Sequence, residues 1–201
     1  MKMLLIVATV FVLCQSLDCP AQISPDPDRI GMYFDTGGIQ TCADFYGGPV
    51  TLYLTITYPT IAAGVSGWEC HVDYTIPSGC FEQGWTLMGS AINVSTAPDF
   101  VVGLGFPIPY SSALVVATYS LLVFCPDCIV WDVRAADVST IPGMPAYAAG
   151  DDPGNIVPLF PLCEELVEAA LNCPEYCGIY DVCGPVPNAP STWGGLKALY
   201  R

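Results

Sequence analysis

The stretch VTLYLTITY, from Val50 to Tyr58, decides the fold class of this chain. Its side chains alternate, so that Leu52, Leu54 and Ile56 would share one side of an extended segment and the threonines the other. A period of two combined with β-branched residues is typical of a strand with one buried face. We therefore predict a β-strand over residues 50–58.

The same alternation recurs along the chain on both sides of this strand. Ser66–Ile76 alternates in the same way, and Ser112–Phe124 is nearly continuously apolar, as in a strand buried on both faces. Turn-forming Pro, Gly and Asp separate the segments, and no long helical period lies between them. About seven to nine short strands in this order predict an antiparallel, Ig-like β-sandwich. The shorter candidate strands are residues 30–34, 81–89, 100–104 and 129–135.

The pattern changes after Ile141. Residues 142–162 are rich in Pro, Gly and Asp, with at most a short strand at 155–160. The segment CEELVEAALNC, from Cys163 to Cys173, carries an apolar stripe and glutamates near its start, which predicts a short helix. We therefore expect a β-sandwich over residues 22–162, a cysteine-rich helical appendage over 163–184, and a Pro linker with a C-terminal tail over 185–201.

The N-terminus predicts the compartment. Lys2 precedes the apolar run LLIVATVFVL (residues 4–13), and small residues lead to Ala21, a layout typical of a secretory signal peptide. That run is about half the ~20 residues of a membrane-spanning helix. Cleavage after Ala21 or after Ser16 both fit. We expect residues 1–21 to be the signal and the mature protein to be secreted or associated with the cell envelope, with no membrane span.

In an oxidising compartment the eleven cysteines predict disulfides. Cys125 and Cys128 flank a Pro-Asp turn, across which the chain ends approach within about 7 Å, so we predict a bridge that closes a hairpin. Cys70 and Cys80 flank another turn and could pair, with Cys42 as a competitor. Redox or zinc chemistry by the cysteines is the alternative. Two local bridges would tie the appendage, using four cysteines: Cys163, Cys173, Cys177 and Cys183.

The acidic balance excludes some partners. Nineteen Asp+Glu against five Lys+Arg give a formal net charge of −14, which repels nucleic acid and anionic membranes. Carboxylates also suit calcium, although no EF-hand frame is present. We expect no resident cofactor, with calcium as the alternative. The calcium candidates are Asp26, Asp28, Asp151 and Asp152.

Few residues of the sequence indicate a catalytic or ligand-binding site. His71, the single histidine, alternates with Glu69 and Asp73 on a polar strand face, so we expect it to be solvated. No Gly-x-Ser-x-Gly nucleophile elbow is present. The tryptophans expected in the core are Trp68, Trp85 and Trp131, and the tyrosines that could form a glycan platform are Tyr33, Tyr53 and Tyr110.

The last ten residues, TWGGLKALYR, combine aromatic and cationic side chains in an otherwise acidic chain. We predict a recognition segment that docks onto export or cell-envelope machinery, and a frayed end is the alternative. Its candidate residues are Trp193, Lys197, Tyr200 and Arg201.

Several phrases resemble a group of exported bacterial proteins known from environmental genomes: DRIGMYFD (28–35), GVSGWE (64–69), PDFVVGLG (98–105), PGMPAY (142–147) and WGGLKALYR (193–201). More remotely, GVSGW, DFVVG and VVATYSLLV (115–123) are similar to strands of cohesin-like and carbohydrate-binding Ig-like sandwiches. The resemblance implies a cohesin-like sandwich that binds rather than catalyses. We predict a secreted, non-enzymatic binding, adhesion or structural module whose partner is an extracellular protein or glycan. A secreted hydrolase that uses acidic residues is the alternative.

Overall fold

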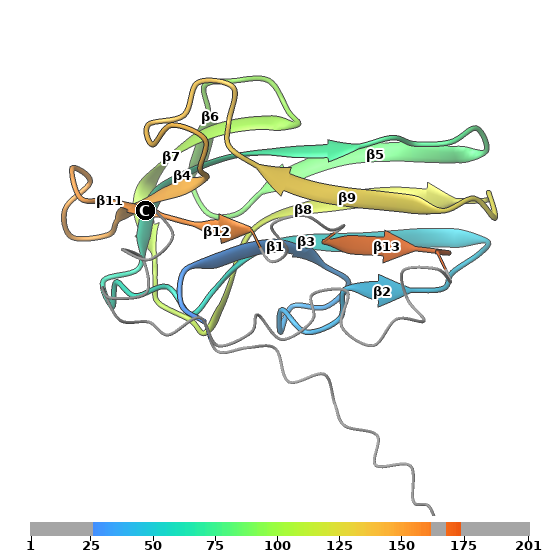
Figure 1. The fold of residues 1–201 in the computed structure, drawn as a ribbon, viewed down its shortest axis with the longest axis horizontal. Helices are drawn as coiled ribbons and strands as arrows, with labels where there is room; N and C mark the ends of the chain where they lie inside the picture. Colours follow the sequence, from blue (N-terminus) through green and yellow to red (C-terminus); the bar gives the residue numbers. More distant parts are fainter. Residues whose placement is uncertain (1–25, 162–167, 174–201) are drawn as a thin grey trace, which may run out of the picture.

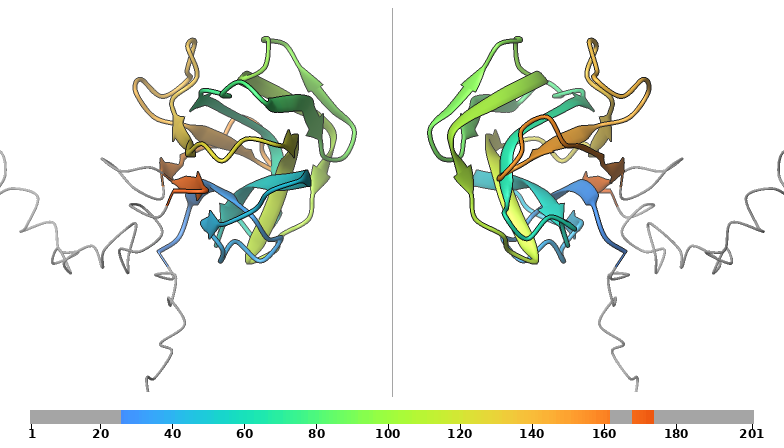
Figure 2. Two further views of the ribbon diagram at one scale, coloured as in Figure 1. Left: turned by 90° about the vertical axis from the view of Figure 1, so that its right-hand side faces the viewer. Right: turned by 90° about the vertical axis from the view of Figure 1, so that its left-hand side faces the viewer.

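A computed structural model describes residues 26–161 and 168–173 of the chain. All regular secondary structure in these residues is β-strand, arranged as two facing sheets (Figures 1 and 2). The predicted β-sandwich is therefore confirmed, but the described residues form thirteen strands and not seven to nine, and two of the strand pairs are parallel and not antiparallel. The expected signal peptide and C-terminal tail lie outside the described residues. No helix in the described part of the chain is long and apolar enough to cross a bilayer.

The smaller sheet has five strands in the order β12-β1-β3-β8-β5. Its centre is the antiparallel pair of β3 and β8, which runs from Gly48 opposite Val123 to Thr57 opposite Ala113. The strand predicted over residues 50–58 is thus present, and the apolar segment 112–124 is its partner. The bounds are β1 Arg29–Tyr33, β3 Gly48–Thr57, β5 Cys80–Leu87, β8 Ala113–Val123 and β12 Phe160–Pro161.

The larger sheet has eight strands. Six follow the order β11-β10-β4-β9-β13-β2, while β7 pairs with β4 and with β6. Strand β4 is the hub, because it pairs with β7 along one edge and with β10 and then β9 along the other. The bounds are β2 Cys42–Ala43, β4 Val65–Tyr74, β6 Ala91–Asn93, β7 Asp99–Ile108, β9 Ile129–Arg134, β10 Ala146–Ala149, β11 Ile156–Pro158 and β13 Ala169–Leu171.

The core lies between the two sheets and is formed by the alternating apolar side chains. Leu52, Leu54 and Ile56 of β3 are fully buried. Trp68 and Trp131 are buried as expected, and the partly buried Trp85 has its ring centroid 4.9 Å from that of Phe100. Period-two alternation therefore fixes which face of each long strand turns inward.

The prediction of a helix over residues 163–173 is wrong for residues 168–173, the part of this segment that the structure describes. Ala169–Leu171 is strand β13, antiparallel to β9 and parallel to β2, and all three residues are buried. A short apolar run fits a helix stripe or a doubly buried strand equally well, and here backbone pairing on both edges decides. These residues are part of the sandwich and not of a separate appendage.

Disulfides are present, but with other partners than those predicted. Cys80 pairs with Cys125 and Cys128 with Cys173, and Cys42 is also disulfide-bonded. Cys125 and Cys128 cannot close a hairpin together, because they follow β8 and precede β9, which belong to opposite sheets. The pair of Cys70 and Cys80 is likewise wrong, since Cys70 is a buried free thiol on β4. The remaining candidates lie outside the described residues: Cys163, Cys177 and Cys183.

Candidate functional site

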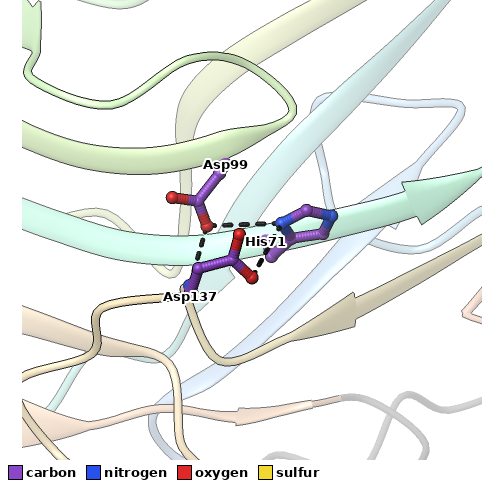
Figure 3. Close-up of side chains that lie close together, drawn as sticks. All are labelled: His71, Asp99 and Asp137. Atoms are coloured by element: carbon purple, nitrogen blue, oxygen red, sulfur yellow. Dashed lines mark hydrogen bonds and ion pairs between the residues drawn. The ribbon is translucent and has the colours of Figure 1, made fainter.

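The one histidine lies in a network of carboxylates on the outer face of the larger sheet. The Nδ1 atom of His71 is 3.3 Å from Asp99 Oδ1 and 3.8 Å from Asp137 Oδ1 (Figure 3). Its Nε2 atom is 3.2 Å from Asp73 Oδ1. The side chain of His71 is only 14% exposed, so the expectation of a solvated histidine is wrong. Strand pairing places Asp99 directly opposite His71, and the loop after β9 folds over both.

Asp99 is the most heavily bonded member of this network. Its Oδ2 accepts a hydrogen bond from Ser95 Oγ at 2.6 Å, and its Oδ1 accepts one from the backbone N–H of Asp137 at 2.9 Å. Burial works against ionisation, but the hydrogen bonds from Ser95, Asp137 and His71 outweigh it and hold the pKa of Asp99 below its usual value. Asp99 therefore acts as an ionised acceptor that fastens three segments together.

This geometry does not favour nucleophilic or metal chemistry. Ser95 donates to Asp99 and not to His71, so the histidine is not placed to activate that hydroxyl. The ligand atoms of His71, Asp99 and Asp137 lie within 4.8 Å of one another, close enough for one cation. The guanidinium of Arg134, however, pairs with both Asp73 and Asp137 and already supplies positive charge there. The hydrolase alternative stays a prediction that a substrate panel tests.

The four calcium candidates do not meet at one point. Asp28 is buried and accepts hydrogen bonds at 2.8 Å from Tyr147 Oη and from both the backbone N–H and hydroxyl of Thr60. Asp26 pairs with Arg29, Asp152 accepts from the backbone N–H of Gly154, and Asp151 is exposed. Of the described residues, the group that could hold a metal is the histidine network and not this set.

A second carboxylate fastens the same loop. Glu69 of β4 points outward yet is only 7% exposed, because its carboxylate accepts hydrogen bonds from the backbone N–H and the hydroxyl of Thr140. The β9–β10 loop, residues 135–145, is thus held against the outer face of the sheet at Asp137 and at Thr140. We call this arrangement the loop clamp.

Thr140 of the clamped loop helps to line a hollow of about 120 Å³. Seven of the residues that line the hollow determine its size and polarity: Gly67, Glu69, Val101, Thr140, Ala146, Ala148 and Ile156. Most of them are small or apolar, and Glu69 supplies one carboxylate. Such a space accommodates an apolar side chain with a polar group at one end.

The floor of the hollow belongs to a row of paired residues that crosses five strands. Directly paired residues point to the same side of a sheet. Two isoleucines at the ends of the row therefore bracket three small residues. A Cβ atom added to Gly103 would meet nothing within 4 Å, so the space above it is open. We call the row and the adjoining hollow the trough. The row runs Ile92, Gly103, Gly67, Ala148, Ile156, from β6 to β11.

Exposed apolar side chains border the trough. Ile92 is 69% exposed, and Val94, which follows the end of β6, is 77% exposed. Val138, within the clamped loop, is 82% exposed. Apolar side chains gathered beside a hollow mark interaction sites more often than apolar side chains scattered singly. The available sequence signal is the pair Gly67 and Gly103, because glycine inside a strand marks a place where another group approaches.

The three tyrosines named as candidates for a glycan platform differ in exposure and do not form a shared exposed surface. Tyr33 is fully buried, whereas Tyr53 is partly buried and Tyr110 is half exposed. The residues predicted for tail recognition lie outside the described part of the chain.

Comparison with known proteins gives structural neighbours only. No protein-family model matches the chain, and no curated protein matches it. Among solved structures the chain is similar to a cohesin module from a family 33 glycoside hydrolase of Clostridium perfringens, at 13% identity and a TM-score of 0.41, over 66% of this chain and 90% of that one. It is also similar to a type II cohesin domain from the cellulosome of Acetivibrio cellulolyticus, at 11% identity and a TM-score of 0.43, over 73% and 96% of the two chains. These similarities assign neither a family nor an activity.

Proposed function

We propose that this protein is an extracellular module that binds another polypeptide through the trough and does not catalyse a reaction. The observation that carries the proposal is the row of glycines and alanine between Ile92 and Ile156, with open space above Gly103. A sheet face normally presents side chains across every strand. Along this row the three central residues present almost none, which leaves room above Gly103 for those of a partner.

The dimensions of the trough support a peptide ligand. Ile92 and Ile156 are separated by four strand spacings, or about 19 Å. The hollow of about 120 Å³ is close in size to the ~150 Å³ engineered cavity that binds benzene, so it fits one aliphatic or aromatic side chain. One anchoring side chain from a short extended segment would therefore fill it.

The charge around the trough supports a cationic partner. Among the described residues, this face has four carboxylates, those of Glu69, Asp73, Asp99 and Asp137, and one guanidinium, that of Arg134. Complementary charge raises the association rate and orients the partner. A segment with Lys or Arg beside its apolar anchor therefore suits this face best.

The disulfides support the extracellular location. Such bridges persist in oxidising compartments and are rare in the cytosol. Together with the expected signal peptide they favour secretion, or retention at the cell envelope. Fractionation of cells that express the intact chain and a chain lacking residues 192–201 tests the role expected for the tail.

Selection of phage-displayed random peptides tests the trough as the binding surface. We expect clones that share an aliphatic or aromatic anchor beside Lys or Arg and that lose binding to a Gly103→Val variant. The matched control is Phe81→Ser, which removes an exposed apolar side chain from β5 on the other sheet. Clones that bind the Gly103→Val variant as well as the unmodified protein would place the binding surface elsewhere.

A further inference from the structure

The chain itself contains a segment with the chemistry that suits the trough. In the described residues both arginines are already paired: Arg29 with Asp26, and Arg134 with Asp73 and Asp137. The remaining cations of the sequence are Lys2, Lys197 and Arg201. The last two stand in the final ten residues, TWGGLKALYR, beside leucines and aromatic residues.

We propose that residues 192–201 of the same chain occupy the trough until an external partner displaces them. This inference rests on the proposed function, since it names a ligand for the same surface. An apolar side chain of the segment fills the hollow between Gly67, Ala148 and Ile156. Lys197 and Arg201 then lie near the carboxylates of the loop clamp.

The electrostatic field at the clamp favours this occupant. Asp132 and Asp73 are paired directly across β9 and β4. Burial and, next, the charge of Asp73 raise the pKa of Asp132. The surface there has more negative charge than Arg134 neutralises, so an added cation is stabilised. A second copy of the sandwich would bring further carboxylates and would be repelled.

The length of the chain allows contact within one molecule. The described residues end at Cys173, which a disulfide joins to Cys128 at the start of β9. Residues 174–191, fully extended, span up to about 60 Å, whereas a domain of this size is roughly 40 Å across. The segment can therefore reach any part of the outer face.

Tethering also lowers the affinity that is needed. A linker of this length gives an effective concentration on the order of 1 mM. A segment whose free peptide binds with a Kd of about 100 μM would then occupy the trough about nine-tenths of the time. Weak binding by the free peptide is sufficient.

Fluorescence anisotropy with a labelled synthetic peptide of residues 192–201 tests the inference. We expect a chain that ends at Ser191 to bind the peptide and the full-length chain to bind it at least tenfold more weakly, because its own segment competes. In the chain that ends at Ser191, Gly103→Val and Ile92→Ser should each weaken binding tenfold or more. Phe81→Ser should leave it unchanged, and a peptide with Lys197→Glu and Arg201→Glu should bind more weakly.

Three results would overturn the inference. The first is a chain ending at Ser191 that does not bind the peptide. The second is equal binding by the truncated and full-length chains, which would mean that the segment does not occupy its own trough. The third is binding that neither Gly103→Val nor Ile92→Ser weakens. If the peptide fails while phage-selected peptides still require Gly103, the proposed function stands and the C-terminal occupant is rejected.

Discussion

The carboxylate of Asp99 accepts a hydrogen bond from the backbone N–H of Asp137 at 2.9 Å, although 38 positions separate the two residues. The same side chain accepts from Ser95 and contacts His71. One residue of β7 therefore holds the loop that lines the trough at Thr140. The shape of the candidate binding surface depends on a buried ionised group and not on the sheet alone.

Replacing Asp99 should loosen the clamp. We expect Asp99→Asn to lower the free energy of unfolding by about 1–3 kcal/mol, because hydrogen bonds to an ionised acceptor are lost or weakened. Urea unfolding measures the change, and faster hydrogen exchange at residues 137–140 locates it. Asp127→Asn, at an exposed position, is the control. Unchanged exchange in the loop would contradict the clamp.

Acid should loosen the same clamp. The pKa of Asp99 is lower in the folded chain than in the unfolded chain, so its ionisation stabilises the fold above the unfolded value of about 3.9. That contribution is lost as the pH falls through the lower folded value. The difference in unfolding free energy between the unmodified protein and Asp99→Asn should therefore be constant near neutrality and shrink below about pH 4. A difference that grows on acidification would contradict this assignment.

Substitution by alanine should change the stability of the fold in opposite directions at two glycines of the trough. A Cβ atom at Gly67 would lie 2.8 Å from the carbonyl oxygen of Val102, whereas one at Gly103 would meet nothing within 4 Å. We expect Gly67→Ala to cost about 1–3 kcal/mol through overpacking. Gly103→Ala should be neutral or stabilising by up to about 1 kcal/mol, since alanine restricts the unfolded chain. Thermal unfolding compares the two, and equal effects would contradict the register.

The disulfide pairing can be tested by the stability lost when one bridge is removed and by peptide mapping. Cys128 and Cys173 are 45 positions apart, and closing such a loop stabilises by about 4 kcal/mol in the chain-entropy account. We expect the double substitution Cys128→Ser, Cys173→Ser to lower the unfolding free energy by about 2–4 kcal/mol. Peptide mapping without reduction should link Cys80 to Cys125. A fragment that joins Cys125 to Cys128 would contradict the pairing.

The thiol of Cys70 should be unreactive while the protein is folded. Burial, followed by the charges of nearby carboxylates, raises its pKa well above the usual value. We expect iodoacetamide to label Cys70 only after denaturation, and mass spectrometry of the labelled peptide measures the extent. Labelling of the folded protein at neutral pH would contradict the burial.

The strands were the predictable part of this fold. Alternation in Val50–Tyr58 and Ser66–Ile76 correctly predicted β3 and β4, because the period of two is a local property of extended backbone. The run 169–171 was predicted as helix because its apolar residues satisfy either period. Only the strands on both sides of it, β9 and β2, make it a strand.

The candidate site was mostly beyond sequence reasoning. His71 was expected in solvent, since Glu69 and Asp73 beside it indicate a polar face. The loop that covers this face comes from residues 135–145, and no local pattern places it there. The trough likewise needs the register of five strands, between Gly67 and Ile156, which no single segment specifies.

The sequence by itself determined that the chain forms a cystine-containing β-sandwich, because side-chain alternation and turn residues act over a few positions. The tertiary structure alone decided which cysteines pair, that hydrogen bonds hold the pKa of Asp99 below its usual value, and that Gly67 and Gly103 are paired in the trough. These features depend on contacts between residues tens of positions apart. Such contacts are set by strand register and by burial, which exist only once the two sheets have packed.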